Sequence, residues 1–274
     1  MNTGSSQFHL PDGAAQHVPG VVGLGYPDLI TLEHRLRVVY PKLRHTAFRY
    51  EHHPGSHIDI ICPYGNRFKA FASEGLDARG VQPGPRSIGL GVAYIEYQVP
   101  FGTAKLISRF YQRMLGAHVS LEGGDYESEP CVFGMMPQRA VVRAGPLQEL
   151  VFTESHAPTA DTGHHIAIYV NHFSNTFEAL NAAGLIYSNP NYPDENADNL
   201  AAAVEQAQFR FRDIISLGDA DCGGTNQGVI LQLEHEVRSI DHPSCCFSAF
   251  CKQQIRDLAA PSTTHLKYEI REQI

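Results

Sequence analysis

Apolar and polar positions alternate over short stretches of this chain and then change to a helical spacing, and the change recurs along the sequence. The first occurrence is "GVVGLGYPDLITLEHRLRVVYPKL" (20–43), where a short apolar strand runs into a turn at Pro27-Asp28. Apolar residues then follow at intervals of three and four: Leu29, Leu32, Leu36 and Val39. This spacing predicts a helix with one buried face.

The same plan occurs twice more. "GVAYIEYQVPFGTAKLISRFYQRMLGA" (91–117) reads as a strand, a turn and a helix ending at Gly116, and "HHIAIYVNHFSNTFEALNAAGLIY" (164–187) repeats it with Gly184 as the stop. Segments rich in Val, Phe and Ile follow each helix and read as further strands. One strand, one helix and about three strands form a repeated supersecondary unit, so the predicted class is α+β, built from βαβββ modules.

Turn residues mark the boundaries between modules. "GLDARGVQPGPRS" (75–87) is rich in Gly and Pro and predicts a linker, and "ESHAPTADTG" (154–163) joins the second and third modules. "SNPNYPDENADN" (188–199) reads as a polar, mobile insertion. The predicted organisation is an N-terminal domain, a C-terminal domain of two paired modules, and a tail with a short helix: residues 1–80, 88–242 (modules 88–156 and 163–242) and 243–274.

Composition narrows the class of protein. The 274 residues carry a net charge of −8 with a pI near 6.0, so the composition does not indicate the basic surface that binds nucleic acid. No apolar run approaches the roughly 18 residues of a membrane span, and the N-terminus lacks the features of a signal peptide. The six cysteines have no regular spacing, which favours free thiols over a metal cluster at Cys245, Cys246 and Cys251. We therefore expect a cytoplasmic protein that handles a small molecule.

Three fragments resemble the vicinal oxygen chelate superfamily, the glyoxalase and extradiol dioxygenase group. "CPYGNRFKAF" (62–71) is similar to the family's tight turn before a module's last strand, and "ISRFYQRMLGAHV" (107–119) to its Phe-Tyr-x-x-x-Leu-Gly helix end. "HHIAIYV" (164–170) resembles the first strand of a metal-bearing module. The resemblance implies that paired modules curl into half-open barrels around a divalent metal.

The first residues fit the same resemblance. "SSQFHLPDG" (5–13) looks like the closing strand of a further module whose opening strand and helix are absent. We therefore expect a chain that is short at its N-terminus relative to similar proteins. The alternative is a free N-terminal arm.

The resemblance also implies a metal site. Family ligands come from a module's first and last strands, and in the third module these positions fall on His165 and Glu234. Neutral imidazole and carboxylate would hold Fe(II) or Mn(II) and leave positions open for substrate. The matching position of the second module is Tyr94 rather than the usual His, so we expect Glu96, two residues on, or water to complete the set. Tyr94 and Tyr169 are the predicted catalytic or pocket residues.

Structural roles for the same residues stay open. A His where a loop enters a strand is often only hydrogen-bonded, and Glu234 could belong to a salt-bridged strand end with Glu236 and Arg238. Glu96 differs, because a carboxylate inside an apolar strand needs a partner or a metal to offset its desolvation. We expect His164 to face the other way and to be solvated.

The remaining positions give weaker signals. Gln148 and Glu154 are lesser candidates on the second module's closing strand. Lys69 occupies that position in the first module, so we expect no metal there.

Two functions follow from these residues. The first is a metal-dependent enzyme that chelates the vicinal oxygens of a small substrate, for ring cleavage by dioxygen or for isomerase or lyase chemistry. The second is a non-catalytic small-molecule-binding protein on the same fold, because fold alone does not fix function. The sequence contains no P-loop, no GxSxG motif and no dinucleotide fingerprint. Because similar proteins pair their modules within or between chains, the resemblance also allows a homodimer.

Overall fold

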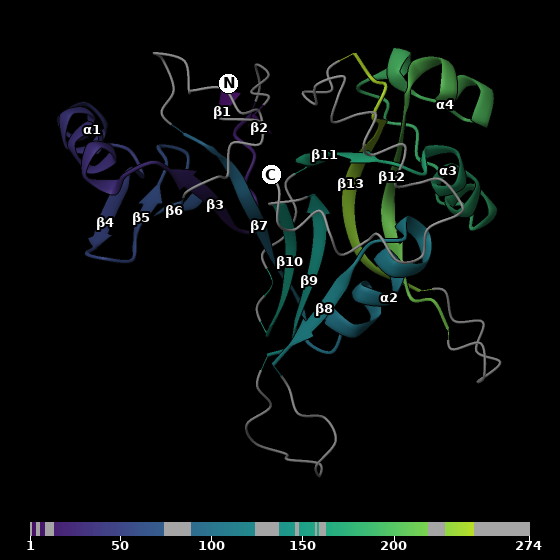
Figure 1. The fold of residues 1–274 in the computed structure, drawn as a ribbon, viewed down its shortest axis with the longest axis horizontal. Helices are drawn as coiled ribbons and strands as arrows, with labels where there is room; N and C mark the ends of the chain where they lie inside the picture. The colour runs from purple at the N-terminus through teal and green to yellow at the C-terminus, as the bar shows by residue number, and fades with distance from the viewer. Residues whose placement is uncertain are drawn as a thin grey trace, which may run out of the picture. The chain divides into compact units, whose positions relative to one another are not determined.

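The computed structural model describes most of the chain as two compact units (Figure 1). The described residues are 2–3, 6–8, 14–73, 89–123, 137–145, 148–156, 158, 163–218 and 228–243. The first unit comprises Met1–His164 with Ile215–Leu231, and the second comprises His165–Ile214 with Gln232–Ile274.

An eight-stranded sheet forms the first unit, in the order β4-β5-β6-β3-β7-β10-β9-β8. Its strands are β3 (Gly20–Tyr26), β4 (Arg49–His53), β5 (His57–Ile61), β6 (Arg67–Ala72), β7 (Gly91–Pro100), β8 (Val119–Glu122), β9 (Arg139–Gly145) and β10 (Gln148–Ser155). Two parallel pairs, β3 with β6 and β7 with β10, lie next to each other and are joined by the antiparallel pair β3 with β7. β4 and β8 are the edges, so the sheet is not closed into a barrel, and the α+β class is confirmed.

Helix α1 (Leu29–Leu43) begins where the sequence predicted. The Asp28 side chain caps it by accepting a hydrogen bond of 2.8 Å from the backbone N of Thr31. Leu29 and Leu32 pack on Ile58 and Ala70 of the sheet. The predicted apolar face is shorter than expected, because Val39 is 37% exposed.

Helix α2 (Ala104–Leu115) packs on β8, β9 and β10. It ends at Gly116, as predicted, and Gly116 has a φ of 64°, the left-handed conformation that favours glycine. Phe110 and Tyr111 are buried, and Tyr111 lies against Phe152 with ring centroids 5.4 Å apart. Burying these aromatic rings against the sheet stabilises the second module.

The carboxylate of Glu154 on β10 holds the start of α2. Its Oε1 accepts a hydrogen bond of 3.0 Å from the backbone N of Ala104, and its Oε2 accepts one of 3.2 Å from the backbone N of Gln138. Glu154 is 2% exposed. This lesser ligand candidate therefore satisfies buried backbone groups.

The second unit has a three-stranded sheet in the order β11-β13-β12. Its elements are β11 (His165–Val170), α3 (Phe173–Ala182), a 3₁₀ turn η1 (Pro193–Glu195), α4 (Leu200–Gln206), β12 (Gln208–Ile215) and β13 (Val229–Ser239). β11 and β13 are parallel. Phe173 and Phe177 of α3 both contact Phe209, with ring centroids 5.1 Å apart, and form the core of the unit.

This third module departs from the predicted plan. In the described residues, the segment that connects α3 to β12 contains no strand where the plan predicted one. Its pairing with the sheet is a single antiparallel bridge between Ile186 and Phe211. Residues 188–199, expected as a mobile insertion, contain η1, and Asn199 caps α4 by accepting a hydrogen bond from the backbone N of Ala202. The sequence did not predict α4.

Several expectations fall on residues outside the described ranges. They concern the whole linker 75–87, nearly all of the tail 243–274 and Cys245, Cys246 and Cys251. The division into 1–80 and 88–242, and the pairing of modules 88–156 and 163–242, stay predictions. Cys62 is free, and none of the described helices is long and apolar enough to cross a membrane.

Candidate functional site

Tyr94 and Gly23 are register partners on β7 and β3. A Cβ added to Gly23 would lie 2.2 Å from Cε1 of Tyr94, so the tyrosine ring occupies the space that the glycine leaves open. The ring is nearly parallel to that of Phe71 on β6, at a centroid distance of 6.4 Å and an angle of 7°. Tyr94 is therefore held across the centre of the sheet by β3 and β6.

The surroundings of Tyr94 keep its hydroxyl protonated. Burial raises the pKa of Tyr94, the negative charges of Glu96 and Asp59 raise it further, and Arg139 partly opposes them. A phenol with a raised pKa is a hydrogen-bond donor at neutral pH. The Tyr94 hydroxyl can thus donate a hydrogen bond to an oxygen atom of a ligand bound on this face of the sheet.

Glu96 has the hydrogen-bond partner that its position in an apolar strand required. The hydroxyl of Thr153 donates to its Oε1 at 2.7 Å, and Arg139 in turn donates to the Thr153 hydroxyl at 3.3 Å. The partner offsets part of the cost of burying the carboxylate. Glu96 follows Tyr94 by two residues on β7 and shares its face. Both residues belong to the first unit, whereas His165 and Glu234 belong to the second.

His165 and Glu234 are register partners on β11 and β13. The side-chain amide of Asn189 donates to both oxygens of Glu234 at 2.8 Å, and Arg210 Nη1 donates to Oε1 at 2.7 Å. Oε2 of Glu236 lies 3.8 Å from Nε2 of His165. The two predicted ligands are adjacent strand positions, but a guanidinium engages the carboxylate of Glu234.

Arg210 on β12 is the centre of a buried ion cluster. Its Nη2 donates to Glu236 at 2.7 Å and to Glu195 at 2.6 Å, and its side chain is 1% exposed. Burial lowers the pKa of Arg210, but Glu236, Glu234 and Glu195 together raise it above its ordinary value. Both oxygens of Glu234 already accept hydrogen bonds, so a metal there would compete with Arg210 and Asn189.

Tyr169 and Arg238 extend this cluster. Arg238 Nη1 donates to the hydroxyl of Tyr169 at 3.3 Å, and Arg238 is also paired with Glu236. The salt-bridged strand end that the sequence left open for Glu234, Glu236 and Arg238 is therefore present.

His164 does not have the solvated position that we expected. It is 9% exposed, and its ring lies 5.6 Å from that of Tyr97, with Nε2 3.3 Å from the tyrosine hydroxyl. The expectation was wrong because His164, the residue before β11, packs against Tyr97 of β7. Both residues belong to the first unit.

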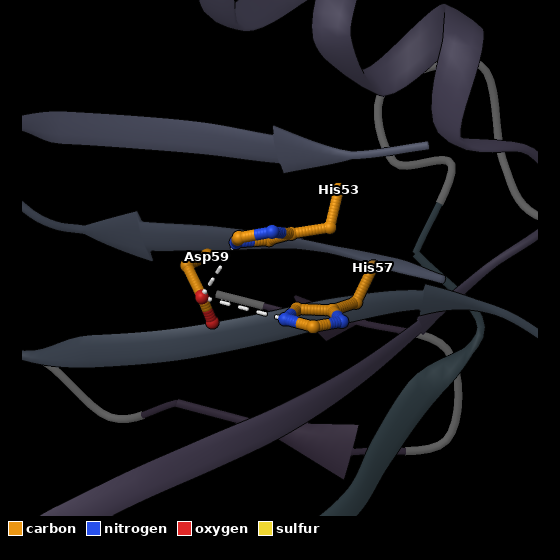
Figure 2. Close-up of side chains that lie close together, drawn as sticks. All are labelled: His53, His57 and Asp59. Atoms are coloured by element: carbon orange, nitrogen blue, oxygen red, sulfur yellow. Dashed lines mark hydrogen bonds and ion pairs between the residues drawn. The ribbon is translucent and has the colours of Figure 1, made fainter. Parts of the chain in front are cut away.

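A group of three metal-ligating side chains lies on the β4–β5 hairpin of the first module. Figure 2 shows Asp59 beside the imidazole rings of His53 and His57, which come from the two neighbouring strands. Asp59 Oδ2 lies 3.1 Å from Nε2 of His53 and 3.4 Å from Nε2 of His57. The ligand atoms of these three residues all lie within 4.8 Å of one another. In the described part of the chain, no other group of three His, Cys, Asp or Glu residues meets this distance.

The hairpin turn explains why these side chains meet. Pro54-Gly55-Ser56 connects the strands, with Gly55 at a φ of 75°, so His53 and His57 are directly opposite each other. Their rings are stacked with centroids 4.5 Å apart. Asp59 follows His57 by two residues and therefore points to the same face.

The donor set fits a divalent ion. Ligand atoms about 2.1 Å from an ion at near right angles lie about 3 Å apart, which matches the two Asp59–imidazole distances. The Ser56 hydroxyl lies 2.8 Å from Nδ1 of His57, where it can orient the ring. The side chains of His53 and Asp59 are 39% and 48% exposed, so a ligand can approach from solvent.

This group of three residues was not among the metal ligands predicted from the sequence. We expected no metal in the first module because Lys69 occupies the closing-strand position, but the group lies on the two strands before it. The missed signal was "HHPGSHID" (52–59), in which a Pro-Gly turn places two histidines opposite each other and an aspartate on the same face.

No known family model matches the chain, and no curated protein matches it in sequence. Its structure is similar to a point mutant of glyoxalase I from Zea mays and to a proposed dioxygenase from Bacillus subtilis, each at 12% identity and a TM-score of 0.46. The matches cover 80% and 83% of this chain but 66% and 63% of those proteins, so the chain spans less than two thirds of their length.

A smaller similar structure is the fosfomycin resistance protein FosX from Listeria monocytogenes in complex with Mn(II). Its identity is 13% and its TM-score 0.31, over 54% of this chain and 91% of that one. The likeness to all three proteins is one of fold, and it assigns no role to an individual residue.

Proposed function

We propose that this chain is a divalent-metal-dependent enzyme of the glyoxalase and extradiol dioxygenase type, acting on a small substrate with vicinal oxygens. His53, His57 and Asp59 hold the metal, with Fe(II) or Mn(II) as the ion. The observation that carries the proposal is the convergence of two imidazole nitrogens and one carboxylate oxygen within 4.8 Å on one hairpin. Two histidines and one carboxylate are the ligand set of non-haem Fe(II) sites that keep positions open for substrate.

When bound, the ion would supply Lewis acidity to the vicinal oxygens of the substrate. The protein's own contribution comes from the same sheet. Burial, and after it the negative charge of Glu96, raise the pKa of Tyr94, so its protonated hydroxyl can donate to a substrate oxygen. Phe71, parallel to the Tyr94 ring, offers an apolar surface for a cyclic substrate.

His165 and Glu234 remain a second candidate location for the ion. Glu234 is paired with Arg210 at 2.7 Å, and a divalent cation there would compete with a buried guanidinium. Tyr169 keeps its predicted role only under this alternative. Metal binding therefore has to be measured for both locations in one experiment.

The test is the metal content of the purified chain after chelator treatment and anaerobic reloading with Fe(II), or with Mn(II) in air. We expect one equivalent in the wild type, and loss of it in His57→Ala and Asp59→Asn. His52→Ala is the matched control, because His52 lies on β4 of the same hairpin and pairs with a carboxylate, Glu33, at 2.8 Å, but belongs to no group of three such ligands in the described residues.

Other outcomes separate the alternatives. Metal that survives in Asp59→Asn but is lost in His165→Ala and Glu234→Gln moves the site to the second unit. Absence of metal from every preparation favours the non-catalytic binding protein. Oxygen uptake with a catechol then tests the activity, and we expect it to fall with metal content across the variants.

A further inference from the structure

Arg210 has one hydrogen-bond donor without a partner. Its Nη1 contacts Glu234, and its Nη2 contacts both Glu195 and Glu236, but its Nε is buried and has no partner in the described residues. A buried, unpaired donor of a charged group costs free energy. The guanidinium therefore has the capacity for one further acceptor.

The three carboxylates around Arg210 are not equivalent. Glu234 and Glu236 are 11% and 4% exposed and lie on β13, in the sheet that also contains β12. Glu195 is 46% exposed and belongs to η1, which is outside the sheet. Glu195 is thus the partner that can leave without disturbing a strand.

The segment that carries Glu195 lies over Arg210. The ring of Tyr192 is 5.0 Å from the guanidinium carbon and 6.0 Å from the ring of His165. Asn189 anchors the same segment through its bond to Glu234. A group that replaced Glu195 would therefore meet the guanidinium beside aromatic rings.

We propose that Glu195 stands in for the carboxylate of a small aromatic ligand, which displaces it from Arg210 and also accepts a hydrogen bond from the vacant Nε. Nε and one hydrogen of Nη2 lie along the same edge of the guanidinium plane, the edge that binds a carboxylate in a bidentate manner. Glu195 contacts Nη2 but not Nε, so a carboxylate that contacts both nitrogens would gain one charge-assisted hydrogen bond.

The exchange also conserves charge. With Glu195 in place, two arginines, Arg210 and Arg238, face three glutamates. Replacing one carboxylate by another leaves this balance unchanged, whereas a neutral ligand would leave Arg210 with one anionic partner fewer. A carboxylate is therefore favoured over its uncharged analogue. Stacking beside Tyr192 favours a planar ring.

The experiment titrates benzoate into the full chain with EDTA present and follows binding by calorimetry or by ligand-observed NMR. We expect Glu195→Gln to bind benzoate about fivefold more tightly or better than the wild type, because a competing internal carboxylate has been removed. Glu205→Gln on α4 is the matched control, since Glu205 is exposed and has no recorded contact with Arg210, and it should bind like the wild type. Benzamide should not bind to the wild type or to either variant.

Equal benzoate affinity in Glu195→Gln and the wild type would overturn the proposal, and so would benzamide binding as well as benzoate. Failure to detect benzoate binding in Glu195→Gln would do so too. Arg210→Lys should abolish binding, and the test does not depend on that variant folding. Because the site contains none of the residues of the β4–β5 hairpin and EDTA is present, its outcome is separate from that of the metal experiment.

Discussion

Arg210 lies 2.7 Å from Glu234, so a guanidinium is paired with the carboxylate that the sequence predicted to bind a metal. Both residues are buried, and Glu236 shares the same guanidinium at 2.7 Å. A buried cation between two glutamates means that each charge depends on the others.

Replacing Arg210 by Met should destabilise the chain by about 3–5 kcal/mol, because two buried carboxylates lose their shared cation. Urea unfolding followed by circular dichroism measures the change. Arg143→Met is the control: Arg143 pairs with Glu149 at 3.3 Å but is 47% exposed, so its loss should cost less than about 1 kcal/mol. Equal effects of the two substitutions would contradict the cluster described here.

Gly23→Ala should destabilise the first unit by about 1–3 kcal/mol, because the new methyl group would overlap the Tyr94 ring. The cost should be largely relieved in the Tyr94→Ala background, where the ring is absent. A double-mutant cycle from urea unfolding curves gives the coupling. Additive effects would show that the ring does not occupy the space over Gly23.

Glu154→Ala should cost about 2–4 kcal/mol, since the backbone N–H groups of Ala104 and Gln138 both lose their buried acceptor. Glu154→Gln retains one carbonyl oxygen and should lose less. Unfolding midpoints of the two variants provide the comparison, and hydrogen exchange should show faster opening at the start of α2 in the alanine variant. A catalytic role for Glu154 without a structural one would instead leave stability unchanged.

Asp28 should make the stability of α1 depend on pH in the acid range. Bonds from the side chain and the backbone N–H of Thr31 lower the pKa of Asp28 from its ordinary value of 3.8. Its stabilisation is therefore complete above that value and is lost as the pH falls through the lower pKa of the folded state. The difference in unfolding midpoint between the wild type and Asp28→Ala should shrink on acidification. A difference that stays constant down to about pH 2 would refute the carboxylate cap.

The local features were determined by the sequence itself. The turn at Pro27-Asp28, the helix stop at Gly116 and the recurring change from alternating to helical spacing each depend on neighbouring residues, whose conformational preferences act over a few positions. The family resemblance, rather than the alternation, indicated His165 and Glu234 as matching strand positions, and the two residues are register partners on β11 and β13.

The partners of those side chains were decided by the tertiary structure. Arg210 reaches Glu234 from a different strand, and Asn189 reaches it from the segment before α4, contacts that span 24 and 45 residues. His53, His57 and Asp59 lie close in sequence, but only the register of β4 on β5 places all three ligand atoms together. Local propensity determines which residues form strands and helices, whereas pairing register and packing determine which buried charge faces which, and that choice decides between a metal ligand and a salt bridge.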